Sequence, residues 1–172
     1  MNNYIKKVLK NIILNKSKID KIVKRLAYQI LESNLNSREI VLIGVYQNGY
    51  FLAQRIFEEL KNISKKKIDI FFIKINKKNP LENLIFECKK ESLKNKSIVL
   101  IDDVLNTGKT LIYCVKSLLD VELHSFKTVV LIDRNHKKYP VKVDFKGISL
   151  STSIADHVEL ILDDNDTYAI IK

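Results

Sequence analysis

The chain has 172 residues, of which 46% are hydrophobic and 29% are charged, and its formal net charge at pH 7 is +10. This length and composition predict a single globular domain, residues 1–172, with a substantial core. They exclude a membrane-spanning protein, because no apolar run approaches the ~20 residues that a transmembrane helix needs. The two cysteines, Cys88 and Cys114, lack metal-ligand spacing, so we expect reduced thiols in a cytoplasmic protein.

The positive charge has two explanations. An excess of basic residues is typical of proteins that bind nucleic acids, and it also suits a polyanionic small ligand. However, nearly all of the excess is lysine, and lysine, asparagine and isoleucine are abundant together, as a strongly AT-biased genome would produce. Charge alone therefore supports RNA as a partner only weakly.

Residues 1–17 form an N-terminal extension with lysines and an apolar stripe. The stripe consists of Ile5, Val8, Leu9, Ile12 and Ile13. The segment lacks the compact apolar region and the cleavage site of a signal peptide. We expect it to dock onto the body of the protein, and a helix lying on a membrane surface is the alternative.

The following elements alternate between helix and strand. Residues 18–33 have apolar side chains at helical spacing, and residues 39–45 form a continuous apolar run of buried-strand length. A turn at 46–49 leads into a helix through about residue 60. Further strands are predicted at 68–75, 97–101 and 128–133, a helix at 110–119, and shorter strands around 143–150 and 157–162. The charged connection 76–96 has the length of a lid.

This alternation predicts an α/β fold with a parallel sheet, in which ligands bind beyond the carboxyl ends of the strands. Those ends are residues 45–49, 75–78, 102–110 and 133–136. The polar turns and the turn glycines fall there, where a binding site is expected.

Residues 97–111, SIVLIDDVLNTGKTL, contain the most informative pattern. A turn of small polar residues before a helix offers backbone N–H groups and the hydroxyls of Thr107 and Thr110 to a phosphate, and Gly108 allows close approach. It is not a Walker A loop, because the first glycine of that motif is absent. Asp102 and Asp103 would repel phosphate unless they bind hydroxyl groups or a bridging Mg²⁺. The alternative without a ligand is a solvated strand end with a helix cap. It explains one of the two aspartates well, but it explains the presence of both poorly.

Residues 98–110, IVLIDDVLNTGKT, resemble the motif with which type I phosphoribosyltransferases bind phosphoribosyl pyrophosphate (PRPP). Residues 129–153 resemble the bifunctional pyrimidine-operon attenuator/uracil phosphoribosyltransferase family, and residues 24–34 and 40–56 parallel its first helix, strand and loop. The resemblance covers about residues 18–165 and is weakest across 72–96. It implies a type I phosphoribosyltransferase fold, with a central parallel sheet flanked by helices and a small C-terminal hood at residues 133–165.

The resemblance also implies roles for individual residues. Asp102 and Asp103 would be catalytic and would hold the ribose hydroxyls, directly or through Mg²⁺. The remaining site residues fall into three groups. The 5′-phosphate group comprises Asn106, Thr107, Gly108, Lys109 and Thr110; the pyrophosphate loop comprises Tyr46, Gln47, Asn48 and Gly49; the hood group, facing base or RNA, comprises Arg134, His136, Lys137 and Lys142. A plain loop-packing role for His136 is equally compatible with its position.

Three departures from the family pattern bear on function. Asn106 stands where purine phosphoribosyltransferases often carry an aspartate that handles a ring proton, which disfavours a purine substrate. Gln47-Asn48 replaces a common Thr-Arg, so the loop lacks an arginine that would meet pyrophosphate. Residues 75–78 replace Tyr-Arg-Asp-Asp, and Lys77 or Lys78 is expected to supply the missing charge. Arg25 falls at a position that is basic in the RNA-binding face of the family.

These observations leave three hypotheses. The first is Mg²⁺-dependent transfer of phosphoribose from PRPP to a nucleobase, with uracil as the first candidate and pyrophosphate released, as in pyrimidine salvage. The second is a regulator of pyrimidine genes that senses PRPP or a nucleotide and binds RNA with little catalysis. The third is transfer to another base or to an amine. The resemblance implies a homo-oligomer and no membrane partner.

Overall fold

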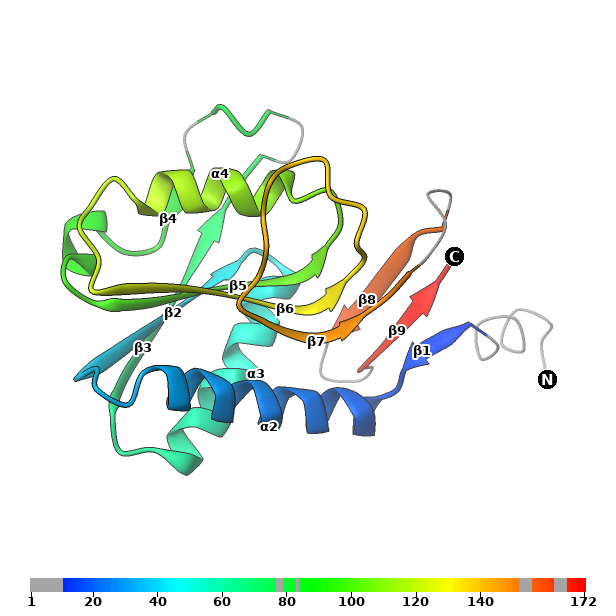
Figure 1. Cartoon of the computed structure of the whole chain (residues 1–172), viewed down its shortest axis with the longest axis horizontal. Helices are drawn as coiled ribbons and strands as arrows, with labels where there is room; N and C mark the ends of the chain where they lie inside the picture. Colours follow the sequence, from blue (N-terminus) through cyan, green and yellow to red (C-terminus); the bar gives the residue numbers. More distant parts are fainter. Residues whose placement is uncertain (1–10, 77–78, 83, 152–155, 163–166) are drawn as a thin grey trace.

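The computed structural model describes residues 11–76, 79–82, 84–151, 156–162 and 167–172 (Figure 1). The larger of its two sheets has the strand order β4-β3-β2-β5-β6-β7. All neighbours in this sheet are parallel except β4, which is antiparallel to β3. In sheet order, the strands are β4 (Ile85–Phe86), β3 (Lys67–Lys74), β2 (Glu39–Val45), β5 (Ser97–Leu105), β6 (Ser125–Asp133) and β7 (Phe145–Ser149).

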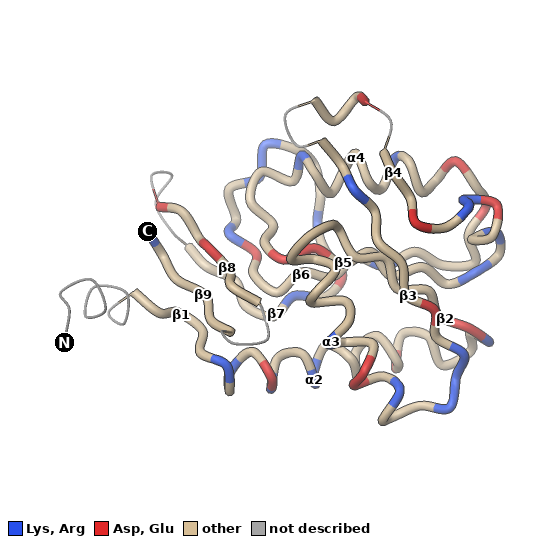
Figure 2. Tube along the Cα trace, turned by 180° about the vertical axis from the view of Figure 1, so that it is seen from behind, with Lys and Arg blue, Asp and Glu red and all other residues tan. Residues whose placement is uncertain are grey.

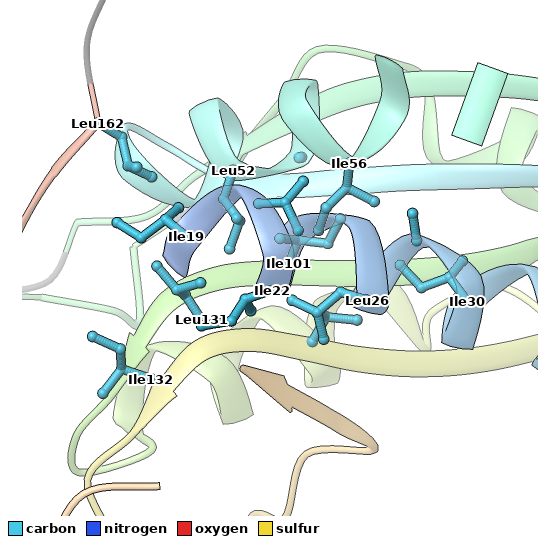
Figure 3. Packing of buried hydrophobic residues seen from close by; sticks show 14 of the residues in the cluster. Ile19, Ile22, Leu26, Ile30, Leu52, Ile56, Ile101, Leu131, Ile132 and Leu162 are labelled. Carbon is cyan, nitrogen blue, oxygen red and sulfur yellow. The ribbon is translucent and has the colours of Figure 1, made fainter. Parts of the chain in front are cut away.

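Helices cover both faces of this sheet, which is why β2 and β5 are apolar along most of their length. Helices α2 (Lys16–Ser33) and α3 (Asn48–Ile63) lie on one face and α4 (Lys109–Leu118) lies on the other (Figure 1). The apolar residues of α2 recur at helical spacing and pack against α3, β5 and β6 (Figure 3). The labelled members are Ile19, Ile22, Leu26, Ile30, Leu52, Ile56, Ile101, Leu131, Ile132 and Leu162.

A second, antiparallel sheet has the order β1-β9-β8 and packs on the same apolar cluster as α2 and α3. Its strands are β1 (Ile12–Leu14), β8 (Val158–Leu162) and β9 (Thr167–Ile171). In β1, Ile12 pairs with Ile170, and Leu14 is buried. The end of the N-terminal extension therefore docks onto the body, as expected, whereas Ile5, Val8 and Leu9 lie outside the described residues.

The predicted α/β fold class is confirmed, with one correction. The sheet is not wholly parallel, because β4 joins its edge in the opposite direction. The connection 76–96 contains regular structure in its second half: β4 pairs with β3, the short 3₁₀ helix η1 (Lys90–Leu93) follows, and Leu93 is fully buried. No helix among the described residues is long and apolar enough to cross a membrane.

Candidate active site

A cleft of about 510 Å³ lies beyond the carboxyl ends of β5 and β6, beside β8. Parallel strands end together at one edge of a sheet, so the polar turns that follow them are brought to one place. The stretch predicted from the sequence, residues 102–110, lines the cleft along its whole length. The other lining residues are Asn48, Leu111, Arg134, His157, Val158, Glu159 and Leu160.

The two adjacent carboxylates are fixed by hydrogen bonds. Strand β5 continues through both of them to Leu105, so they follow the backbone of a hydrogen-bonded strand. Asp102 is 6% exposed and its Oδ1 accepts from the backbone N–H of Asp103 at 2.9 Å. Asp103 Oδ2 accepts from Asn48 Nδ2 at 3.0 Å, and the same amide also donates to the carbonyl of Leu160 at 3.0 Å. Asn48 thus connects the carboxylate pair to β8.

The turn after β5 is shaped by Gly108. Its φ is +82°, a left-handed conformation that disfavours other residues, and a Cβ there would lie 2.4 Å from Val141 Cγ2. The carbonyl of Thr107 accepts from the backbone N–H groups of Lys138, at 2.9 Å, and Tyr139, at 3.1 Å. Helix α4 begins at Lys109, and the N–H groups of a first helical turn lack intrahelical partners. This geometry suits an anion.

A second pocket, of about 270 Å³, shares Asn48, Asp102 and Asp103 with the cleft. Its remaining described lining residues are Val45, Tyr46, Gln47, Gly49, Lys74 and Ile75. The Tyr46–Gln47 peptide bond is cis. A Cβ on Gly49 would lie 2.8 Å from the carbonyl oxygen of Ile101, so glycine lets the start of α3 approach β5. All four residues of the expected loop, 46–49, therefore lie beside the carboxylate pair.

Arg134 is the hood residue that reaches the cleft. It is 3% exposed, and its Nη1 donates to Asn106 Oδ1 at 3.3 Å while its Nη2 donates to the carbonyl of Asp156 at 2.7 Å. The structure does not bring the other expected hood residues into the cleft: His136, Lys137 and Lys142 are absent from its described lining.

Two of the expected cations, Lys137 and Arg25, have structural partners. Lys137 donates to Asp133 Oδ2 at 3.2 Å, and Lys146 donates to the same oxygen at 3.3 Å. Burial alone would raise the pKa of the Asp133 carboxyl, but the N–H of Asn135 and these two ammonium groups outweigh it and hold that pKa below its ordinary value. Arg25 donates to the carbonyl of Gly147 at 2.6 Å, so it joins α2 to β7.

Sequence reasoning missed three lining residues with ionisable side chains. His157 and Glu159 come from β8 and its approach, and Lys74 ends β3 inside a predicted apolar strand. The one available signal was the period-two alternation along β8, which indicated that one face of this strand packs against the rest of the protein. The lysines expected to replace the lost arginine, Lys77 and Lys78, lie outside the described residues.

The donor set suits a divalent cation carried on a phosphorylated ligand. Among the residues that the structure describes, no group of three or more His, Cys, Asp or Glu side chains could enclose a metal ion. Mg²⁺ is usually held by one or two carboxylates together with substrate phosphates and water. Asp102 and Asp103, next to an anion-binding turn, offer that arrangement.

Comparisons with known proteins agree with this geometry. The family model of the phosphoribosyl transferase domain matches residues 10–165. The bifunctional protein PyrR of Clostridium botulinum (strain Alaska E43 / Type E3) is 31% identical over 175 residues, covering 95% of this chain and 96% of the relative. The bifunctional protein PyrR of Brevibacillus brevis is 29% identical over 171 residues, with 95% and 96% covered.

Solved structures show the same fold. A hypoxanthine phosphoribosyltransferase from Staphylococcus aureus matches with a TM-score of 0.79 at 21% identity, covering 99% of this chain and 96% of that chain. The hypoxanthine phosphoribosyltransferase of Trypanosoma cruzi matches with a TM-score of 0.79 at 19% identity, with 94% and 95% covered. The chain belongs to the type I phosphoribosyltransferase family and is similar over most of its length to bifunctional PyrR proteins.

Proposed function

We propose that the protein transfers phosphoribose from PRPP to a nucleobase with the help of Mg²⁺, and that uracil is the acceptor. One observation carries the proposal. The Asp102–Asp103 pair lies between the turn 106–110 on one side and the turn 46–49 on the other, and it lines both pockets. PRPP has the matching order of groups: a 5′-phosphate, a ribose diol and a pyrophosphate.

In this proposal, the backbone amides and hydroxyls of 107–110 hold the 5′-phosphate, and the two carboxylates hold the ribose hydroxyls. The bond between ribose C1 and pyrophosphate breaks and its electrons leave with pyrophosphate. A ring nitrogen of the base forms the new bond to C1 and releases its proton to water. When bound, Mg²⁺ would stabilise the negative charge of the departing pyrophosphate. The chain itself would position PRPP and the base for reaction. Its backbone amides would also point toward the negative charge that develops on the departing pyrophosphate.

The acceptor follows from the hydrogen bond between Arg134 and Asn106. A guanidinium has donors only, so the atom of Asn106 that faces it must be the oxygen. Asn106 lines the cleft, and its amide nitrogen has no hydrogen bond among the described residues. It offers a donor and cannot accept a proton. We therefore infer an acceptor base that presents a carbonyl oxygen to this donor, such as uracil, in preference to a purine of the kind that the aspartate of purine phosphoribosyltransferases assists at this position.

Turnover is tested by incubating the protein with PRPP, Mg²⁺ and one base at a time while pyrophosphate release is followed. The expected result is release with uracil that exceeds release with hypoxanthine, guanine, adenine or cytosine. Binding of PRPP without turnover on any base would contradict transfer and support a regulator.

A regulator that binds RNA is the second candidate, and the lysines outside the cleft favour it. Lys138 and Lys142 are exposed beside the cleft, and Figure 2 shows Lys and Arg along many elements of the chain. Binding to a pyrimidine-gene leader RNA is compared with binding to a scrambled RNA at increasing salt. Specific attenuation requires a preference that persists at moderate salt. Equal affinities that both collapse with salt would reflect phosphate electrostatics alone and would contradict it.

A further inference from the structure

Asn48, the first residue of α3, lies at the boundary between the two pockets of the site. It lines both of them, together with Asp102 and Asp103. The next residue, Gly49, packs so closely on β5 that a Cβ there would lie 3.0 Å from Asp102 Cα. The close approach of these two backbones places the side chain of Asn48 beside the carboxylate pair.

The amide nitrogen of Asn48 is fully occupied by the protein. It donates to Asp103 Oδ2 and to the backbone carbonyl of Leu160, each at 3.0 Å. A backbone carbonyl can only accept, so the atom of Asn48 that faces Leu160 must be the nitrogen, and that nitrogen has two hydrogens. A pyrophosphate in the neighbouring pocket would therefore meet no free donor on the side chain of Asn48.

The hydrogen bond to Asp103 fixes one carboxylate oxygen and leaves the other for a ligand. Oδ2 is held by Asn48, whereas Oδ1 has no hydrogen bond among the described residues. Holding one oxygen sets the rotation of the carboxylate, and so it sets the direction of the other oxygen. Because the donor approaches a charged group next to a second carboxylate, that of Asp102, it also offsets part of the repulsion between them.

The second hydrogen bond ties this carboxylate to β8. Residues 158–160 of that strand line the cleft, and Leu160 pairs with Ala169 of β9 within the small sheet. The side chain of Leu160 is buried, so the strand is anchored in the core at this point. A single amide thus joins Asp103, on the large sheet, to a wall of the cleft that comes from the small sheet.

We propose that Asn48 is a positioning residue for phosphoribosyl transfer, which acts through Asp103 and does not bind pyrophosphate with its side chain. The inference rests on the proposed function, in which Asp103 holds the ribose hydroxyls. Asn48 keeps the carboxylate of Asp103 against β8, with Oδ1 left to accept from a ribose hydroxyl. Its loss lets that carboxylate rotate, and the ribose then has to order it on binding.

The test measures binding of ribose 5-phosphate and, separately, of pyrophosphate by calorimetry, both without Mg²⁺ so that no contact is made through the metal. Asn48→Ala removes the amide, and Asn48→Leu keeps about the same volume without a donor or a charge. Gln54→Ala is the matched control, because Gln54 is an exposed amide on the same helix, with no hydrogen bond among the described residues. Urea unfolding checks that each variant is folded.

Both Asn48 variants are expected to bind ribose 5-phosphate about 10-fold or more weakly, the size of a lost hydrogen bond to a charged group. Pyrophosphate binding is expected to be unchanged in both, and Gln54→Ala is expected to behave like the wild type. A role in packing alone would survive in Asn48→Leu. Wild-type affinity for ribose 5-phosphate in either variant would overturn the inference, as would equal weakening of the two ligands.

The same substitutions in an Asp103→Ala background show whether Asn48 acts through Asp103. There the amide has no carboxylate to hold, so further weakening of ribose 5-phosphate binding is expected to stay below about twofold. Equal weakening in both backgrounds would mean that Asn48 contacts the sugar itself, and it would overturn the positioning role.

The wild-type titrations separate this inference from the proposed function. If the wild-type protein binds PRPP and ribose 5-phosphate and the Asn48 variants match it, the role of Asn48 is refuted and PRPP binding stands. If the wild-type protein binds neither ligand, both proposals are refuted.

Discussion

The carboxamide oxygen of Asn106 accepts a hydrogen bond from Arg134 Nη1 at 3.3 Å, which joins the turn after β5 to the end of β6. The guanidinium is almost fully buried, and the N–H of Arg134 also donates to the carbonyl of Leu105 at 3.0 Å. The buried guanidinium of Arg134 therefore sets the orientation of the Asn106 amide. In the proposed function, this orientation decides which hydrogen-bonding group of Asn106 an acceptor base would meet.

Asn106→Asp is predicted to shift the acceptor preference toward purines. The carboxylate can still accept from Arg134, and it adds a proton acceptor that the amide lacks. The ratio of pyrophosphate release with hypoxanthine to release with uracil is expected to rise at least about tenfold, since general-base catalysis contributes about 100-fold or more. An unchanged ratio would remove Asn106 from the selection of the base.

Gly108→Ala is predicted to destabilise the fold and weaken binding of the 5′-phosphate. The left-handed φ costs a non-glycine residue about 1–2 kcal/mol, and the added methyl would press against Val141. Urea unfolding measures the loss of stability. In a Val141→Ala background the clash is relieved, so part of the loss from Gly108→Ala should be recovered. Full retention of stability in the single variant would contradict the turn geometry.

Asp103→Asn is predicted to reduce the use of PRPP by about 100-fold or more, because it removes a carboxylate charge next to the proposed ribose and metal site. An asparagine oxygen can still accept from Asn48, so the fold should persist. Steady-state pyrophosphate release measures the effect, and unfolding curves check the fold. A rate equal to that of the wild type would refute the assignment of Asp103.

Asp133→Asn is predicted to cost about 2–4 kcal/mol at pH 7, because two lysines would lose a buried partner. The pKa of Asp133 is lower in the folded protein than its ordinary value of 3.8, so its stabilisation is present well above that pH and is lost as the pH falls below it. The variant should therefore lose less stability than the wild type between pH 5 and about pH 2. Asp144, whose pKa is also lowered, still contributes in both proteins.

Asp120→Asn serves as the control for that measurement. Asp120 forms an ion pair with Lys90 but its side chain is 60% exposed, so its loss should cost less than about 1 kcal/mol. Equal losses for Asp120→Asn and Asp133→Asn at pH 7 would show that the burial of Asp133 adds nothing.

The sequence indicated the layout of the sheet and most of the cleft because the signals are local. Apolar runs at 39–45 and 97–101 predict buried strands, and the turn at 106–110 is recognisable from its residue types alone. The structure places β2, β5 and the start of α4 accordingly. Strand β5 runs on to Leu105, since pairing with β6 extends it through two charged residues.

What the sequence did not indicate depends on contacts between distant segments. Ile12 and Ile13 belong to the apolar stripe of the N-terminal extension, yet Ile12–Leu14 forms a strand because β9 offers an edge to pair with. Lys74 interrupts an apolar strand, and only the tertiary structure places it beside Tyr46. Arg25 resembled a residue of a basic surface, but carbonyl groups at Lys146 and Gly147 accept its hydrogen bonds.

The most direct test of the account is a calorimetric titration of the wild-type protein with PRPP, with and without Mg²⁺, alongside Asp103→Asn. The account predicts saturable binding at one site per chain, strengthened by Mg²⁺ and weakened by about 100-fold or more in the variant. No binding of PRPP, or binding that is the same in both proteins and indifferent to Mg²⁺, would contradict it.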